Sequence, residues 1–148
     1  MANRYWIDGT GDWSDTDHWS ATSGGSAGAS VPTRNDNYWI ETSLYNWGVA
    51  NVSPVVYWSD ETYDASYGYG WLMGFGEGHY LKTTNKRVRA TRTYIHNAPL
   101  APRTLTQGGI VYKVIDIGGG FYANHICSLY DISSYINWTD AHTIVGAI

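Results

Sequence analysis

Aromatic and acidic side chains alternate over a short stretch in the middle of the chain. Between residues 57 and 71, three carboxylates lie among tyrosine and tryptophan rings. Such rings stack on the faces of sugars while carboxylates accept hydrogen bonds from hydroxyl groups, so the stretch suits contact with a glycan or a protein. Packing of the same rings inside the fold is the alternative interpretation. The candidate ligand-binding residues are Trp58, Asp60, Glu61, Tyr63, Asp64, Tyr67, Tyr69 and Trp71.

A histidine and a cysteine offer a second kind of chemistry. His125 and Cys127 lie two residues apart in an expected strand, so their side chains share one face. A Cys–His catalytic pair has this composition, but nothing around the two residues would activate the thiol. We interpret them as a buried thiol beside a hydrogen-bonded histidine. Because Cys127 is the single cysteine, the sequence also excludes an internal disulfide and a thiolate metal cluster.

Two acidic groups resemble metal-binding loops only in composition. Asp12, Asp15 and Asp17 lie near glycines but lack the ligand spacing and the closing glutamate of an EF-hand. The group around Asp60 and Asp64 could bind calcium or sugar hydroxyls, and a solvated loop explains it as well. We therefore predict no metal site.

Recognised catalytic motifs are missing from the sequence. There is no Gly-x-Ser-x-Gly elbow, no phosphate-binding loop, no His-Glu-x-x-His and no Cys-x-x-Cys. The glycines of residues 68–78 alternate with tyrosine and tryptophan, which predicts a strand and a turn. We expect a non-catalytic protein without a cofactor.

The composition favours strands and half-exposed rings. The chain has 148 residues, enough for one domain or one domain with an extended arm. It contains 13 tyrosines and 8 tryptophans but 2 phenylalanines, so most aromatic surface carries a polar group suited to interfaces. Its 17 glycines disfavour long helices.

Charge and hydropathy exclude two classes of partner. The chain has few basic residues and a pI of about 5.6, so we expect no nucleic-acid partner. No apolar stretch approaches the roughly 20 residues of a membrane span, so we expect no membrane insertion. Residues 1–8 lack a basic start followed by an apolar run, which predicts no secretory leader.

The acidic residues are concentrated in the first part of the chain. Residues 1–64 hold nine acidic side chains against Arg4 and Arg34, whereas the remainder holds four acidic and seven basic ones. A head-to-tail contact between copies would use this asymmetry, and a solvated surface explains it equally well.

Short apolar runs bounded by turn residues predict a series of strands. Gly76-Glu77-Gly78 is expected to form one hairpin turn and Gly118-Gly119-Gly120 another. Arg87 and Arg89 should lie exposed on one strand face, either for solubility or against an acidic partner surface. Residues 141–148 could begin a short helix. The expected strands are residues 37–41, 55–58, 69–75, 79–83, 87–95, 110–117 and 121–129.

Several spaced segments resemble a bacterial and phage lectin-like family. These are residues 57–67, Phe75-Gly76-Glu77-Gly78, Lys82 and residues 87–94, which match the second half of that family's domain. Members include the C-terminal domain of the Legionella collagen-like adhesin. The resemblance covers about forty residues. It implies a C-type-lectin-like fold.

The first half of the same domain resembles a later part of the chain, so the order is inverted. The matching segments are residues 108–112, Asp131-Ile132-Ser133 and Ile136-Asn137-Trp138. Since the first and last strands of that fold pair, residues 87–95 and 110–117 are expected side by side, within one subunit or across two. The family's central helical portion is missing, which weakens any transfer of its ligand site.

The beginning of the chain resembles another module. Residues 4–15, His18-Trp19-Ser20 and Val31-Pro32-Thr33 are similar to a segment at the start of phage structural proteins and large bacterial surface β-proteins. This implies a virion or cell-surface setting. Trp6, Trp13 and Trp19 are expected to anchor this glycine- and serine-rich arm to a neighbouring surface.

Together these observations predict a mainly β protein with little helix. An arm (1–34) precedes a small antiparallel lectin-like sheet (35–148), divided into the family's second half (35–96), a linker (97–108) and its first half (109–148). The expected function is that of a structural or accessory phage virion protein, such as a capsid decoration, neck or tail component. Its expected partners are copies of itself in a homo-oligomer, other virion or surface proteins, and cell-surface glycan. A stand-alone carbohydrate-binding adhesin and a filament-forming extracellular surface protein are the alternatives.

Overall fold

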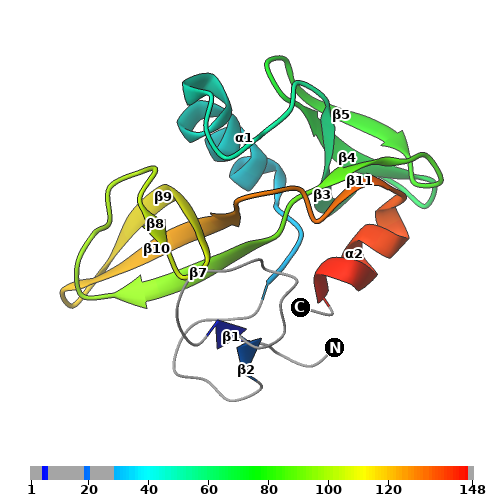
Figure 1. Ribbon diagram of the computed structural model, residues 1–148. Coiled ribbons are helices and arrows are strands. Elements are labelled where there is room, and N and C mark those ends of the chain that lie inside the picture. The colour runs from blue at the N-terminus through cyan, green and yellow to red at the C-terminus, as the bar shows by residue number, and fades with distance from the viewer. Residues whose placement is uncertain (1–4, 7–18, 21–28, 147–148) are drawn as a thin grey trace.

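The computed structural model describes residues 5–6, 19–20 and 29–146, and it confirms the mainly β prediction (Figure 1). A four-stranded sheet has the order β7-β10-β9-β8, and a five-stranded sheet has the order β11-β6-β3-β4-β5. The first sheet contains β7 (Thr91–His96), β8 (Leu105–Thr106), β9 (Gly109–Gly118) and β10 (Phe121–Ser128). The second contains β3 (Val56–Thr62), β4 (Tyr67–Leu72), β5 (Gly76–Leu81), β6 (Lys86–Val88) and β11 (Ser133–Ile136). The helical elements are α1 (Arg34–Ser43), η2 (Tyr45–Trp47) and α2 (Trp138–Gly146).

The long hairpin of β9 and β10 agrees with the sequence prediction. Its apolar strands are joined by Gly118, Gly119 and Gly120, all of which have positive φ angles. L side chains avoid that region of backbone conformation, so three consecutive glycines allow this turn.

The two segments expected to pair directly are instead separated by one strand. β7 and β9 belong to the same sheet, but both pair with β10, which lies between them. The expected strand 87–95 is also divided, because β6 joins the five-stranded sheet and β7 the four-stranded one. The chain therefore passes from one sheet to the other at Arg89 and Ala90.

The second sheet depends on glycines that let rings approach the backbone. A Cβ atom built at Gly68 would lie 2.5 Å from Cδ1 of Trp138, and one at Gly70 would lie 3.0 Å from Cδ2 of Tyr80. The prediction of a turn at Gly76-Glu77-Gly78 is wrong. These residues begin β5, and the turn that precedes them contains Phe75, whose amide donates to Leu72 O at 2.9 Å.

Residues 37–41, predicted as a strand, lie within α1. The run Tyr38-Trp39-Ile40 has strand-like composition, but a capping box starts a helix just before it. Thr33 Oγ1 accepts from the Asp36 amide at 3.0 Å, and Asp36 Oδ2 accepts from the Thr33 amide at 3.1 Å. These reciprocal bonds satisfy two amides that a helix start otherwise leaves unpaired, and they override the apolar pattern.

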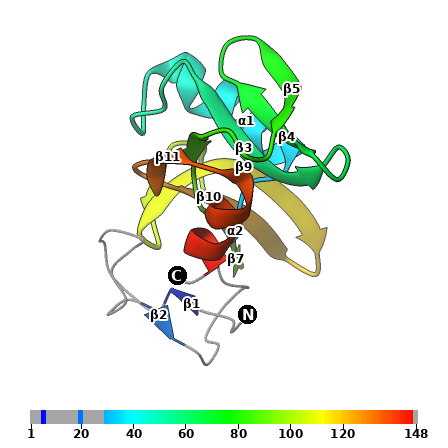
Figure 2. The same cartoon turned by 90° about the vertical axis from the view of Figure 1, so that its right-hand side faces the viewer.

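β3 separates two hydrophobic core clusters. Trp58 packs in one cluster, where Ala141 and Val145 of α2 cover the sheet. Tyr57, the adjacent residue, points to the other side and packs in a cluster with Ile40 of α1. In both views α1 lies above β3 and α2 below it (Figures 1 and 2). Because neighbouring residues of a strand face opposite sides, β3 contributes side chains to both clusters.

The N-terminal prediction falls mostly outside the described residues. β1 (Tyr5–Trp6) and β2 (Trp19–Ser20) pair antiparallel, with Trp6 opposite Trp19 in the register. Trp13 and the side chains of all three tryptophans lie outside what the structure describes, so their anchoring role stays a prediction. Residues 29–31 do contribute to the fold, since Ala29 and Val31 are buried in the core.

Neither α1 nor α2, the helices of the described chain, is long and apolar enough to cross a membrane.

Candidate functional site

One face of the β4–β5 hairpin carries most of the predicted ligand-binding rings. Side chains alternate along β4, so Tyr67, Tyr69 and Trp71 point to one side while Gly68 and Gly70 form the other. In the register, Tyr69 lies opposite His79 and Trp71 opposite Glu77, which places these β5 side chains on the same side. We call this surface the aromatic face and define it as Arg34, Tyr38, Glu61, Tyr63, Tyr67, Tyr69, Trp71, Glu77 and His79.

Tyr63 lies at the centre of the ring contacts. Its ring stacks on His79 with centroids 4.1 Å apart and an interplanar angle of 7°. Tyr69 and Tyr67 meet it edge-on at 5.6 and 6.5 Å. Tyr63 is 51% exposed despite these contacts. A ligand can therefore reach a ring whose orientation is already fixed by its neighbours.

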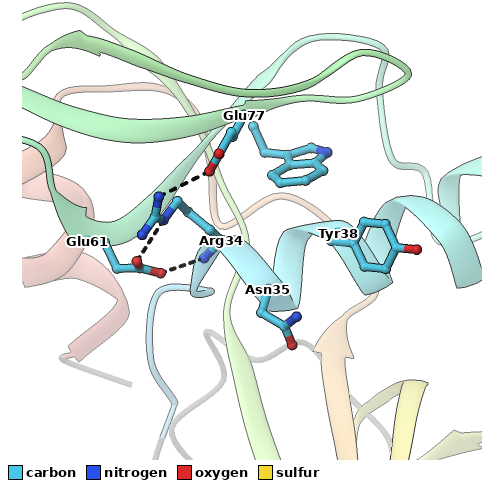
Figure 3. Close-up of a pocket in the computed structure, with 6 residues that line it drawn as sticks. Arg34, Asn35, Tyr38, Glu61 and Glu77 are labelled. Atoms are coloured by element: carbon cyan, nitrogen blue, oxygen red, sulfur yellow. Dashed lines mark hydrogen bonds and ion pairs between the residues drawn. The ribbon is translucent and has the colours of Figure 1, made fainter.

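Arg34 joins the rings to the carboxylates (Figure 3). Its guanidinium lies 3.9 Å from the centroid of the Tyr69 ring, and its Nε donates to Glu61 Oε2 at 2.7 Å. An Nη atom donates to Glu77 at 3.2 Å, and the Arg34 amide donates to Glu61 Oε1 at 2.9 Å. The hydrogen bond to Glu61 is the main cause that raises the pKa of Arg34. One cation is thus held between two anions.

A depression of about 410 Å³ opens beside this ion pair, between α1 and the ends of β3, β4 and β5 (Figure 3). The Tyr38 ring meets Trp71 edge-on at 6.1 Å along one wall. Glu41 fixes the orientation of the Trp71 ring, because its Oε2 accepts from the indole nitrogen at 3.0 Å and from the Gly74 amide at 2.6 Å. The depression is lined by Arg34, Asn35, Tyr38, Glu61, Trp71 and Glu77.

The structure brings five of the eight predicted ligand-binding residues into the aromatic face: Glu61, Tyr63, Tyr67, Tyr69 and Trp71. Trp58 does not belong to it and is not available to a ligand. Its side chain is completely buried, and its indole nitrogen donates to Ile136 O at 2.8 Å. The strand alternation that exposes the rings of β4 turns Trp58 into the core.

Asp60 and Asp64 have other surroundings. Asp64 Oδ1 accepts from the amides of Ser66 and Tyr67, both at 2.8 Å, so this carboxylate stabilises the turn between β3 and β4. Burial, followed by the charge of Glu61, raises the pKa of Asp60, and the charge of His142 on α2 opposes that shift.

Sequence reasoning missed four members of the aromatic face: Arg34, Tyr38, Glu77 and His79. Arg34 and Tyr38 were missed because the capping box that places them on a helix was overlooked. Glu77 was assigned to a turn instead of a strand. A signal for the β5 residues was present, since Glu77 and His79 alternate with glycine as the rings of β4 do.

The Cys127 and His125 pair is held in a state unsuited to nucleophilic chemistry. Cys127 is completely buried, and this burial raises the pKa of its thiol to about 11. Burial also lowers the pKa of His125, whose Nδ1 lies 3.2 Å from Thr93 Oγ1. A nucleophilic cysteine requires the thiolate, which is scarce at neutral pH in this environment. Within residues 29–146 and the two short N-terminal strands, no group of histidine, cysteine and acidic residues could hold a metal ion.

The expected exposure of Arg87 and Arg89 is wrong for the second residue. Arg89 is completely buried, and Arg87 is about one-third exposed. Both donate to Asp131 at 2.7 Å. Arg89 lies just beyond the end of β6, so the two residues do not share a strand face, but both side chains reach one carboxylate of the same chain.

Comparisons of the chain with family models, with curated proteins and with solved structures find no match.

Proposed function

We propose that this protein is a non-catalytic structural or accessory protein of a phage virion, such as a decoration, neck or tail component, and that its aromatic face adheres to a partner surface. The observation that carries the proposal is the group of exposed, mutually fixed rings around Tyr63, flanked by the carboxylates of Glu61 and Glu77. The virion setting rests on the resemblance of the N-terminal residues to a module of phage structural proteins.

The charges of the aromatic face favour a hydroxyl-rich ligand over a phosphate. Arg34, which could otherwise bind an anion, already has Glu61 and Glu77 as partners. Carboxylates accept hydrogen bonds from sugar hydroxyls, and the exposed ring of Tyr63, which Tyr69 meets edge-on, offers surface on which a sugar can stack. This arrangement also supports the second candidate, a stand-alone carbohydrate-binding adhesin.

Binding of the full-length chain to an array of bacterial surface glycans tests the adhesive role. We expect reproducible binding by the wild type and about a five- to hundredfold loss in Tyr63→Ala and Tyr69→Ala, since removal of one ring that stacks on a nucleic-acid base costs roughly 1–3 kcal/mol. Tyr135→Ala is the matched control, because Tyr135 is 76% exposed on β11, at the opposite edge of the sheet. Equal binding by wild type and Tyr63→Ala would contradict the proposal.

The genes that flank this one distinguish the virion role from the adhesin alternative. Neighbours that encode capsid or tail proteins are expected if the chain belongs to a particle. Neighbours that encode only secretion and cell-envelope proteins, together with glycan binding, would favour the stand-alone adhesin instead.

A further inference from the structure

β5 has an open edge in the described part of the chain. It pairs with β4 along one side, and no described strand pairs with the other side, where β5 forms the margin of the sheet (Figure 1). Just beyond the strand, Lys82 N donates to Ser66 O at 2.9 Å and continues the same register. Because hydrogen-bonded residues alternate along a strand, the even-numbered residues of β5 are the ones whose backbone groups bond to β4. Since backbone groups alternate in direction, the N–H and C=O groups of Glu77 and His79 point outward, as does the Leu81 N–H. The Leu81 carbonyl already accepts from the amide and the hydroxyl of Thr84, at 2.9 and 2.6 Å.

This edge carries one charged residue, Glu77, with Lys82 just beyond its end, and otherwise lacks the features that usually prevent strand pairing. Exposed edges are commonly protected by lysine, proline or a bulge, and β5 contains neither lysine nor proline. Apolar side chains are exposed at both ends of the strand. Phe75, just before it, is 86% exposed, and Leu81, its last residue, is 44% exposed.

We propose that a second copy of this chain pairs antiparallel with this edge, β5 against β5, about a twofold axis at Gly78. In that register, Glu77 lies opposite His79 of the second copy. The twofold axis also places His79 of the first copy opposite Glu77 of the second. Phe75 comes opposite Leu81 of the second copy, so the exposed apolar groups at each end cover one another. A carboxylate opposite an imidazole can accept a hydrogen bond from a ring N–H, and such polar pairs, like apolar pairs, stabilise a sheet when they lie directly across two strands.

The side chains select this register over its neighbours. A shift of the axis to Glu77 would place two glutamates opposite each other, and a shift to His79 would place two histidines opposite each other. A glycine at the axis lets the two backbones approach without a side chain between them. Within one chain a Cβ atom at Gly78 would lie 2.9 Å from Oη of Tyr80, so a larger residue there would displace the end of that side chain.

The pairing would join the aromatic faces of the two copies. Glu77 and His79 belong to that face, and an axis perpendicular to the sheet keeps both faces on one side. His79 would then contact Tyr63 of its own copy, on which it already stacks, and Glu77 of the other. The dimer does not depend on what the aromatic face binds, so the inference goes beyond the proposed function.

Sedimentation velocity of the full-length chain over a range of concentrations tests the pairing. The wild type is expected to form a dimer. His79→Glu places like charges opposite each other at two symmetric positions and should raise the dimer dissociation constant by roughly tenfold or more. The double variant Glu77→His/His79→Glu exchanges the two side chains, places a carboxylate opposite an imidazole again, and should restore the dimer. Thr83→Glu adds the same charge outside the strand and should leave the dimer unchanged.

Phe75→Ser provides a second variant that cannot disturb the core, because Phe75 is largely exposed. It should also weaken the dimer, while circular dichroism shows an unchanged fold. A wild type that stays monomeric at its highest soluble concentration would overturn the proposal. A dimer that tolerates His79→Glu would also overturn the proposal, and so would a dimer that the exchange of the two side chains fails to restore. Phe75 lies outside the aromatic face, so glycan binding measured on Phe75→Ser separates this result from the proposed adhesive role: the dimer should weaken while binding by each single chain is kept.

Discussion

Nε of the completely buried Arg89 lies 2.7 Å from Oδ1 of Asp131, 42 residues further along the chain. The same carboxylate accepts from Arg87 at 2.7 Å and from the hydroxyl of Tyr57 at 2.8 Å. A second guanidinium nitrogen of Arg89 donates to Ser128 O at 2.7 Å. These contacts connect β6, β3 and the segment between β10 and β11 at the place where the chain changes sheets.

Replacing Asp131 with asparagine should destabilise the fold strongly. The change leaves the Arg89 charge buried without a counter-charge, and breaking a buried pair in this way costs about 3–5 kcal/mol. Urea unfolding measures the loss. Arg87→Gln serves as the control, because Arg87 is partly exposed and its ion pair should contribute no more than about 1 kcal/mol. Equal losses in the two variants would contradict the role assigned to burial.

Stability should fall at alkaline pH because of the Cys127 thiol. Burial raises the thiol pKa from 9.0 to about 11 in the folded chain, whereas the unfolded chain loses the proton near the ordinary value. The contribution of the buried, protonated thiol to the free energy of unfolding is therefore complete below pH 9. It is lost as the pH rises through about 11, and the total loss approaches roughly 3 kcal/mol.

Urea unfolding at about pH 8 and about pH 10.5 checks this effect, with Cys127→Ala as the control. The variant should lose less stability between the two pH values than the wild type. Burial also raises the pKa values of Tyr57 and Tyr112. The wild type and the Cys127→Ala variant both contain these tyrosines, so the difference between their losses of stability reports on the thiol. An identical decline in both would show that the thiol does not contribute.

Gly68→Ala should disturb the packing of α2 on the sheet. The added methyl group would lie 2.5 Å from the Trp138 ring, whose indole nitrogen donates to Ser59 O at 3.0 Å. Overpacking of this kind costs about 1–3 kcal/mol in thermal or urea unfolding. When Gly68→Ala is made in a chain that already carries Trp138→Ala, it should cost much less than in the wild type, because the methyl group then meets free space. Additive losses would rule out the clash as the cause.

Thr33→Ala should weaken the start of α1. The substitution removes the hydroxyl that accepts from the Asp36 amide, and loss of such a cap costs about 1 kcal/mol. Thr42→Ala, near the end of the same helix, is the control and should change stability by less than about 0.5 kcal/mol. If the two variants unfold at the same urea concentration, the cap does not stabilise the helix.

The parts of the fold that depend on local pattern could be predicted from the sequence. The β9–β10 hairpin follows from apolar strands around three glycines, and the alternation of rings and glycines in β4 indicates a strand with two different faces. α1 was also predictable, because Thr33 and Asp36 have the spacing of a capping box. The apolar run at Tyr38 predicts a strand instead, so two local signals compete at this point of the chain.

Other features depend on contacts between distant residues and carry no local signal. Nothing near Arg89 in the sequence indicates that Asp131 will bind it, so the division of the predicted strand 87–95 could not be foreseen. The same holds for β10, which lies between β7 and β9. Five residues of the aromatic face were predicted from composition alone, whereas Arg34 reaches it only because α1 starts beside Glu61.

The turn at Gly118, Gly119 and Gly120 has a practical consequence. All three residues are exposed, and Cβ atoms built at Gly118 and Gly120 would meet no neighbour within 4 Å. The turn lies at the end of the β9–β10 hairpin, beyond the buried residues of both clusters. A foreign peptide, such as an antibody epitope, could be inserted into this turn with the three positive-φ glycines kept, which makes the loop a graft point for displaying sequences away from the core.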